Sequence, residues 1–469
     1  MNDSTRTTDT QAPHGDEHIA LRLLLGWSVG TVGTVTLLYV VNYAFMFYMT
    51  DLLGVSAVVA GALIFGVRIY DMFADPLMGV ISDHTRSRMG RRRPWMLAGG
   101  IISAAGCAML FNAPAALLAN GGGMLAGWAL VALLLYFTGY SMFAVPYMAM
   151  PAEMSTSFSE RTRLLSARVF FVSISSLLGT AVTPQLIKTF GANLSGYGKT
   201  ALIMATISLF AMLAAVVGTA GARATEKSPL HVPLRQQFRL ALANRPFFVL
   251  IACKFLLLMS MSALTTSLFY FVTYVLKRDF TTVAEIGLSQ TLGMLISLPF
   301  WMWLGKRWQK QHIFMLAAGI DALFLLGYLL AGPAEPVFIL WARAAGVGFF
   351  AGGALLMGQA MLPDTMEYDY RRSGLRREGT FSGLYSVVEK AGFAFGPLVL
   401  GITLSAFGYV ATKAGAPLVT QSPETLRALY LGAAVIPAVA TLLCVPLLLA
   451  YTLTESNLRA MRPPVAEPS

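Results

Sequence analysis

About twelve runs of roughly twenty apolar residues follow one another along this chain, and each is long enough to cross a lipid bilayer as a helix. Their starts lie near Leu23, Val55, Trp95, Met124, Leu164, Thr200, Phe247, Thr281, Ile313, Pro336, Thr380 and Thr425. Only 12% of the residues are charged, whereas a soluble domain carries about a quarter. The sequence therefore predicts an all-α membrane protein with twelve transmembrane helices.

Basic residues concentrate in every second loop between these runs. They fall within residues 86–93, 161–163, 223–245, 306–310 and 371–377, while the intervening loops carry fewer. Cytoplasmic loops of membrane proteins are enriched in lysine and arginine. The alternation predicts a multi-pass protein of the cell inner membrane with both termini cytoplasmic. It also accounts for the net charge of +11 without a nucleic-acid partner.

The longest polar segment covers residues 223–245 and contains Pro229 and Pro233. It separates six apolar runs from six others, which is a common layout of membrane transporters with two helix bundles. We therefore expect bundles at residues 21–222 and 246–456, joined by a cytoplasmic linker at 223–245. Residues 1–20 and 457–469 are expected to form disordered tails.

Two acidic residues, Asp71 and Asp75, lie four residues apart inside the second apolar run, and Arg68 precedes them by one turn. On a helix the three side chains share one face. A charge inside the membrane costs about 3 kcal/mol or more unless it is paired or hydrated. One interpretation is a structural ion pair with Arg68. The other, which we favour, is a water-facing site for a coupling cation, H⁺ or Na⁺, with no other cofactor.

Two cationic residues are candidates for the same region. Lys390 lies deep in the eleventh run, and a lysine at that depth needs a partner such as Asp71 or Asp75. Arg168 lies near the start of the fifth run. Its side chain either extends to the membrane surface or serves in solute binding or gating.

Other embedded charges favour structural roles. Asp83, at the end of the second run, is expected to pair with Arg86 or Arg88. Lys254, Asp321 and Arg343 lie in the second half of the chain, and we expect them to pair with one another or to extend to the surface.

A mixed-charge segment follows the tenth run. It contains Asp364, Glu367, Asp369, Arg376, Arg377 and Glu378. This is either a solvated loop or a cytoplasmic gate. In the second case, salt bridges to the basic loop of the first half, with Arg86, Arg88, Arg91 and Arg92, hold the inner side shut.

Several tyrosines inside the apolar runs are candidates for stacking against a sugar. They are Tyr43, Tyr140, Tyr147 and Tyr385. The alternative for each is ordinary packing or a place at the membrane interface.

Five motifs occur in order along nearly the whole chain. They are Arg68-x-x-Asp71-x-x-x-Asp75-Pro76-x-x-Gly79, the loop Arg86-Ser87-Arg88-Met89-Gly90-Arg91-Arg92-Arg93-Pro94-Trp95, Val145-Pro146-Tyr147-x-Ala149, Glu160-Arg161-Thr162-Arg163-Leu164, and Arg376-Arg377-Glu378-Gly379 ahead of Lys390. In these motifs the chain resembles the glycoside–pentoside–hexuronide:cation symporters, the melibiose-permease branch of the major facilitator superfamily.

The resemblance implies two six-helix bundles, alternating access, and symport of a sugar, glycoside or related small solute with H⁺ or Na⁺. It also implies that Asp71 and Asp75 form the cation site, that Ser141 holds the position of a hydroxyl ligand, and that Lys390 lies close by. The partners expected are one solute, one monovalent cation and the lipid bilayer, and we expect a monomer.

The chain departs from this branch at the sugar site. The branch holds its sugar with an acid on helix one and another on helix four, next to a tryptophan. Val35, Ala144 and Met148 occupy these positions here. Galactoside-type binding is therefore not expected, although Arg68, Ala144, Met148 and Arg168 remain candidates for solute contact. Ala74 replaces an amide that often precedes Asp75, and one oxygen fewer favours H⁺ over Na⁺.

Three alternatives stay open. The vertebrate lysolipid symporters are similar to this family and also lack the sugar acids, so the solute could be an amphiphile. A Mg²⁺-dependent membrane transferase could use Asp71, Asp75 and Asp83, although the usual aspartate motif of such enzymes is missing. A non-transporting regulator is the third.

Overall fold

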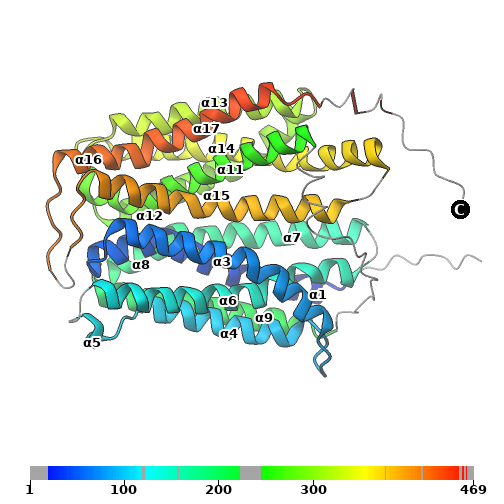
Figure 1. The fold of residues 1–469 in the computed structure, drawn as a ribbon, viewed down its shortest axis with the longest axis horizontal. Coiled ribbons are helices and arrows are strands. Elements are labelled where there is room, and N and C mark those ends of the chain that lie inside the picture. Colours follow the sequence, from blue (N-terminus) through cyan, green and yellow to red (C-terminus); the bar gives the residue numbers. More distant parts are fainter. Residues whose placement is uncertain are drawn as a thin grey trace, which may run out of the picture.

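Every regular element of the computed structural model is a helix in the part of the chain that it describes, residues 19–118, 122–155, 158–221, 244–374, 377–412, 416–453, 457–458 and 461. The long helices run side by side along the long axis of the molecule (Figure 1). The first half contains α1 (Leu21–Ser28), α2 (Gly30–Phe47), α3 (Ala57–His84), α4 (Arg93–Leu110), α5 (Ala115–Leu118), α6 (Gly122–Met154), α7 (Phe158–Leu177), α8 (Thr183–Thr189) and α9 (Leu194–Gly218). The second half contains α11 (Arg245–Tyr270), α12 (Phe280–Gly305), α13 (Lys310–Leu326), α14 (Val337–Ser373), α15 (Glu378–Ala406), α16 (Pro423–Tyr430) and α17 (Ile436–Leu449).

Eleven helical stretches among the described residues are long and apolar enough to cross a membrane. The helix α4 is the remaining long one, and its 18 residues include Arg93 and Pro94 in the first turn. It packs lengthwise against α6 and α9, so it completes a set of twelve. The predicted all-α membrane fold is confirmed, and each predicted run corresponds to one of these helical stretches.

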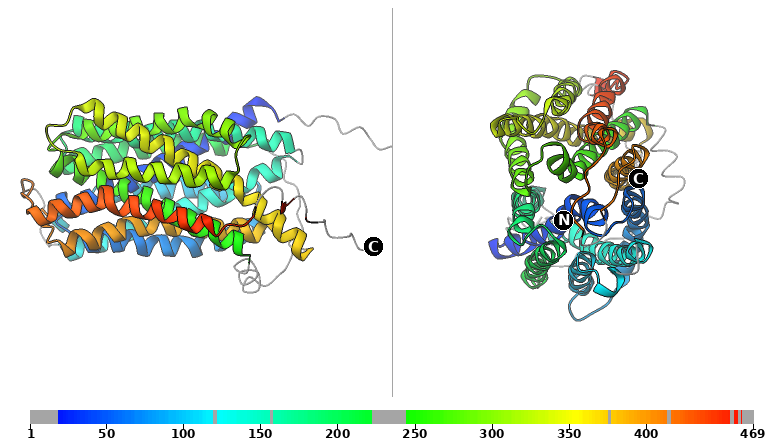
Figure 2. Two further views of the ribbon diagram at one scale, coloured as in Figure 1. Left: turned by 90° about the horizontal axis from the view of Figure 1, so that it is seen from above. Right: turned by 90° about the vertical axis from the view of Figure 1, so that its left-hand side faces the viewer.

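The helices form two groups that follow the order of the chain. In the first half, α2 packs against α9 and α7, while α4 packs against α6. In the second half, α11 packs against α15 and α17, while α12 and α13 pack against α14. Seen end-on, the blue-to-cyan helices of the first half lie on one side and the yellow-to-red helices of the second half lie on the other (Figure 2). Most of the expected linker lies outside the described residues.

The helices α4 and α6 pack closely against each other. A Cβ atom added to Gly139 would lie 2.3 Å from the backbone nitrogen of Ser103, and one added to Gly99 would lie 2.5 Å from the backbone nitrogen of Phe143. Neither backbone can shift alone without moving its helix. Small residues thus allow these two helices to approach closely, as is common in membranes.

Four of the transmembrane stretches contain a π-helical turn, in which each hydrogen bond spans five residues. These turns are η1 (Tyr48–Leu52), η2 (Leu178–Val182), η3 (Phe271–Val275) and η5 (Leu431–Val435). All four lie near α8 and α16, at the end of the molecule away from the loop between α3 and α4 (Figure 1).

At this same end, polar contacts join the two halves, and we call it the closed end. Asp51 accepts hydrogen bonds from the hydroxyls of Tyr274 and Tyr409 in the second half. Lys188 lies 2.8 Å from a carboxylate oxygen of Asp279. The backbone N–H of Val58 donates to Ser405 Oγ at 3.2 Å. The opposite end, which carries the loop between α3 and α4, is called the terminal end.

Candidate cation and solute site

The two intramembrane acids of α3 face a lysine from the other half of the molecule. The ammonium nitrogen of Lys390, on α15, lies 2.7 Å from Asp71 Oδ2 and 2.5 Å from Asp75 Oδ2. The same nitrogen donates a 3.3 Å hydrogen bond to the backbone carbonyl of Asp71. One ammonium thus bridges two carboxylates, and this group of three carries one net negative charge.

A hydroxyl group completes the surroundings of the buried acid. Ser141 Oγ, on α6, donates a 2.7 Å hydrogen bond to Asp71 Oδ1. Asp71 is fully buried, whereas the side chain of Asp75 is 28% exposed. Two carboxylates and one hydroxyl are oxygen donors of the type that Na⁺ takes, and either carboxylate can bind a proton. The described residues contain no group of three or more His, Cys, Asp or Glu side chains that could hold a metal ion.

Arg68 does not neutralise this acid pair. Its side chain is only 4% exposed, and its Nη2 donates a 3.0 Å hydrogen bond to the side-chain oxygen of Asn42. The guanidinium lies 4.7 Å from the ring centre of Phe137. No described acid lies within ion-pair distance of Arg68, so the interpretation of a structural pair between Arg68 and the aspartates is wrong.

A cavity of about 750 Å³ lies between the halves and includes Asp75 and Lys390 in its wall. Among the residues predicted to contact solute, those that line it are Arg68, Tyr140, Ala144, Met148 and Arg168. Gly79, near the C-terminal end of α3, and Gly383, near the start of α15, also line it. These two helix ends lie at the terminal end (Figure 1). The cavity therefore extends from the acid pair toward the terminal end.

The other tyrosine candidates pack away from this cavity wall. The Tyr147 hydroxyl is 2.7 Å from Thr31 Oγ1, and its ring stacks on Trp27 with ring centres 4.9 Å apart. Tyr385 is buried, with the ammonium of Lys254 4.9 Å from its ring centre. Tyr43 is buried on α2. These three tyrosines therefore contribute packing in this conformation.

Sequence reasoning missed several cavity residues. Gln359 on α14 and Ser386, Glu389 and Phe393 on α15 line the cavity beside Lys390. The α15 residues lie three or four positions from one another or from the lysine, so a helical face drawn through Lys390 would have identified them. Gln359 offered only the weaker signal of an amide inside an apolar helix.

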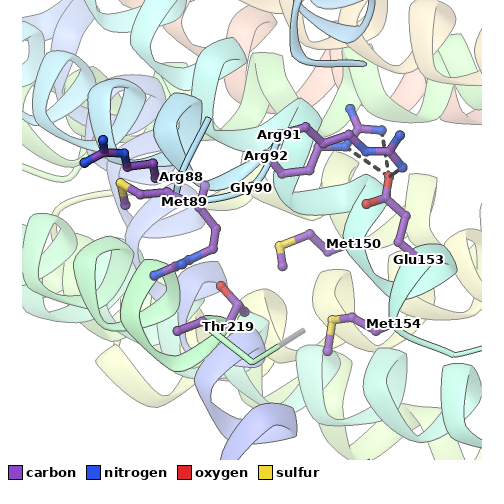
Figure 3. A pocket seen from close by; sticks show the side chains of 11 residues that line it. Arg88, Met89, Gly90, Arg91, Arg92, Met150, Glu153, Met154 and Thr219 are labelled. Atoms are coloured by element: carbon purple, nitrogen blue, oxygen red, sulfur yellow. Dashed lines mark hydrogen bonds and ion pairs between the residues drawn. The ribbon is translucent and has the colours of Figure 1, made fainter. Parts of the chain in front are cut away.

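The arginine loop after α3 forms a polar pocket of about 190 Å³ at the terminal end (Figure 3). Arg91 and Arg92 both point to Glu153 of α6, at 2.9 and 2.8 Å from its Oε1. Arg92 also pairs with Asp83. The predicted partners of Asp83, Arg86 and Arg88, were wrong, because the loop folds back over α3 and brings Arg92 to that helix end.

The predicted gate residues of the second half also pair within their own half. Lys310 lies 2.6 Å from Asp364, Arg371 lies 2.6 Å from Glu367, and Arg377 lies 3.0 Å from Asp369. Arg376 and the side chain of Glu378 lie outside the described residues. The three pairs of Asp364, Glu367 and Asp369 therefore each lie within the second half.

The three embedded charges of the second half do not pair with one another. Lys254 lies 3.9 Å from Glu389, and Arg343 makes two contacts of 2.5 and 3.0 Å with Glu335. Asp321 is buried on α13 and forms no ion pair with a described residue. The expectation of mutual pairing was wrong, because Lys254 faces Glu389 on α15 and Arg343 faces Glu335 in the loop before α14.

Comparison with known proteins assigns the family. The family model described as MFS/sugar transport protein matches residues 26–455. An uncharacterized symporter, YnaJ, of Bacillus subtilis is 28% identical over 444 residues, which cover 93% of each chain. An isoprimeverose transporter of Lactiplantibacillus pentosus is 27% identical and covers 84% of this chain, with 81% of its own length matched.

Solved structures agree on the fold. A bacterial homologue of the human drug peptide transporters PepT1 and PepT2 superposes with a TM-score of 0.66 at 13% sequence identity, covering 93% of this chain and 98% of that one. The resemblance drawn from the motifs is confirmed, and the transferase interpretation falls because the family and the relatives are transporters. The chain therefore belongs to the MFS/sugar transport protein family and is a multi-pass membrane transporter.

Proposed function

We propose that this transporter carries a small organic solute together with H⁺ or Na⁺ by alternating access. The observation that carries the proposal is the position of Lys390, whose ammonium bridges Asp71 and Asp75 at the wall of a cavity between the halves. A monovalent cation and this ammonium compete for the same carboxylate oxygens. The names of the relatives, a symporter and an isoprimeverose transporter, support a coupled solute carrier.

The coupling follows from the charge of this group. Without a bound cation, Asp71, Asp75 and Lys390 together carry one negative charge, and both acids hold Lys390 across the halves. A proton or Na⁺ at the carboxylates removes that charge and frees Lys390 from one of its partners. A bound ion can shift the equilibrium between facing states only as far as it stabilises them differently. Because Lys390 belongs to the second half and the acids to the first, cation binding acts on a contact between the halves.

We propose H⁺ rather than Na⁺ as the preferred coupling ion. Ser141 is the one hydroxyl that donates to the acid pair among the described residues. Ala74, before Asp75, supplies no side-chain oxygen. A proton needs a single carboxylate oxygen, whereas Na⁺ needs a fuller shell of oxygens.

We also propose that the terminal end faces the cytoplasm of a bacterial inner membrane, so that both termini are cytoplasmic. The arginine loop, Lys306 and Arg307 in the loop after α12, and Lys310 at the start of α13 lie on that side, in accord with the bias of cytoplasmic loops toward lysine and arginine. In this orientation the closed end faces outward.

Reconstituted protein tests the proposal. Liposomes containing the full chain are given labelled isoprimeverose or labelled methyl glucuronide, with an imposed proton gradient, an imposed Na⁺ gradient or neither. We expect gradient-driven accumulation by the native chain and none by Asp75→Asn, which keeps its fold. Asp83→Asn is the matched control, because it removes an acid of the same helix that lies outside the cavity wall. Accumulation by Asp75→Asn equal to that of the native protein would refute the proposal.

A further inference from the structure

Two arginines face the central cavity without an acidic partner. Arg68 projects from α3 and Arg168 from α7, and both line the cavity that contains Asp75 and Lys390. The described residues offer neither arginine a carboxylate within ion-pair distance. The inference drawn from them rests on the proposed function, since it concerns the solute that this cavity admits.

Arg68 is held rigidly while its charge stays uncompensated. Only 4% of Arg68 is exposed, and its buried Nε has no hydrogen-bond partner. Its one hydrogen-bonded neighbour, Asn42, is neutral, and the face of the Phe137 ring supports the guanidinium. A buried arginine of this kind is costly unless an anion completes its hydrogen bonds.

Arg168 approaches the cavity from a different helix. Its Nε is also buried and has no hydrogen-bond partner. The two guanidinium groups belong to separate walls of one chamber. Such planar groups match the paired oxygens of carboxylate, sulfonate and phosphate groups.

The other charges of the cavity do not cancel the arginines. Glu389 lies 3.9 Å from the ammonium of Lys254, so those two charges offset each other. The group of Asp71, Asp75 and Lys390 carries one negative charge, which a bound monovalent cation neutralises. In the cation-loaded protein, both arginine charges therefore remain unbalanced.

The rest of the cavity wall is largely apolar. Leu38, Met72, Ala144, Met148 and Phe393 all line it. The chamber therefore combines an apolar lining with two guanidinium groups that have no acidic partner among the described residues.

We propose that the transported solute is an organic oxyanion, whose carboxylate, sulfonate or phosphate group binds to Arg68 and Arg168. Binding of the anion satisfies the buried guanidinium nitrogens and cancels charge in the chamber, which makes the loaded state easier to close. A neutral glycoside leaves both arginine charges in place. A sugar acid and an anionic single-chain lipid share this chemistry, and the probes below separate them.

Binding to the purified full chain tests the proposal without any transport measurement. The probes are methyl glucuronide, the matched neutral methyl glucoside, and a lysophosphatidate below its micellar concentration, measured by calorimetry at saturating proton or Na⁺ concentration. We expect at least one anionic probe to bind about tenfold or more tightly than methyl glucoside. Preference for the glucuronide identifies a sugar acid, and preference for the lysophosphatidate identifies an amphiphile.

Variants separate recognition from folding. Arg168→Gln should weaken binding of the anionic probe about tenfold or more. Arg168→Lys keeps the charge but loses the paired donors, so its affinity should lie between those of the native protein and Arg168→Gln. Arg163→Gln is the matched control, since Arg163 lies on the same helix and pairs with Glu160 instead of lining the cavity. A melting temperature equal to that of the native protein shows that a variant is correctly folded.

The outcomes distinguish this proposal from the proposed function. Failure of every anionic probe to bind, equal binding of methyl glucoside, or unchanged anion affinity in Arg168→Gln overturns the oxyanion assignment. Accumulation of a neutral glycoside driven by the cation gradient would overturn it while leaving symport intact. Arginine-dependent anion binding without gradient-driven accumulation would keep it while refuting the coupling.

Discussion

The hydroxyl of Tyr409 donates a 2.5 Å hydrogen bond to Oδ2 of Asp51, although the two residues belong to different halves of the molecule. The hydroxyl of Tyr274 donates to the other carboxylate oxygen, and Thr50 donates to Oδ2 at 2.5 Å. Asp51 is 2% exposed, and no cation forms an ion pair with it among the described residues. Opening of the closed end has to separate Asp51 from both tyrosines.

Asp51→Ala should therefore loosen the closed end. The substitution leaves the two tyrosine hydroxyls of the second half without this acceptor, which costs about 1–3 kcal/mol and shifts the ratio of closed to open molecules roughly five- to a hundredfold. The measurement is the rate of disulfide cross-linking between cysteines introduced at Val58 and Ser405, which meet across the halves. Tyr430→Phe is the control, because its hydroxyl bonds to Ala331 inside the second half. Unchanged cross-linking in Asp51→Ala would contradict the role given to this contact.

Asp279→Asn should have a much smaller effect at the same end. The hydrogen bond from Lys188 holds the pKa of Asp279 below its ordinary value of 3.8. A lowered carboxyl pKa means that the contact contributes above the ordinary pKa and is lost only as pH falls through the lowered one. Both side chains are about half exposed, so the pair contributes at most about 1 kcal/mol. In the same assay, the rate of cross-linking should change less than about fivefold and should not depend on pH between roughly 5 and 8. A steep pH dependence of the native protein that Asp279→Asn abolishes would disprove this.

Lys390→Ala should separate exchange from net transport. In the variant, the cation-free carrier has to change its facing state with two carboxylates that no lysine balances. Loss of roughly 3 kcal/mol of buried charge pairing slows this return step about a hundredfold or more. Exchange of labelled solute between two loaded states avoids the return step and should persist. Liposome counterflow and net uptake, measured on one preparation, check the prediction. Equal loss of both activities would contradict it.

Gly139→Ala should destabilise the contact between α4 and α6. The new Cβ would meet backbone atoms of α4 at 2.3 Å, and overpacking of this kind costs about 1–3 kcal/mol. Gly319→Ala in α13 is the matched control, because a Cβ there meets nothing within 4 Å and alanine favours a helix by up to about 1 kcal/mol. Thermal unfolding in detergent should fall for the first variant and stay equal or rise for the second. An unchanged melting temperature for Gly139→Ala would show that the helices can separate freely.

Much of the architecture follows from the sequence because membrane helices are long, apolar and separated by polar loops. The same logic singled out Asp71, Asp75 and Lys390, since a charge at that depth must find a partner or water. The structure places the three in contact. Hydropathy and helical spacing are local properties, and these features depend on little else.

Contacts that depend on how helices rotate against one another were harder to predict. Asp83 pairs with Arg92 because the arginine loop folds back, and nothing in the order of its arginines distinguishes Arg92 from Arg88. Tyr140 lines the cavity while Tyr147, two turns later on α6, packs on Trp27. Asp51 attracted no functional interpretation, because its tyrosine partners lie more than 200 residues away in the chain.

The π-helical turns have a consequence for how the closed end can move. Each holds an extra residue relative to an α-helical turn, and a turn that tightens to α geometry releases it as about 1.5 Å of added rise. Four membrane-crossing helices can thus change their length slightly at the closed end, while the described helices near the arginine loop contain no π-helical turn. Twisting at the closed end can be absorbed within single helices, whereas separation at the terminal end has to move whole helices as rigid bodies.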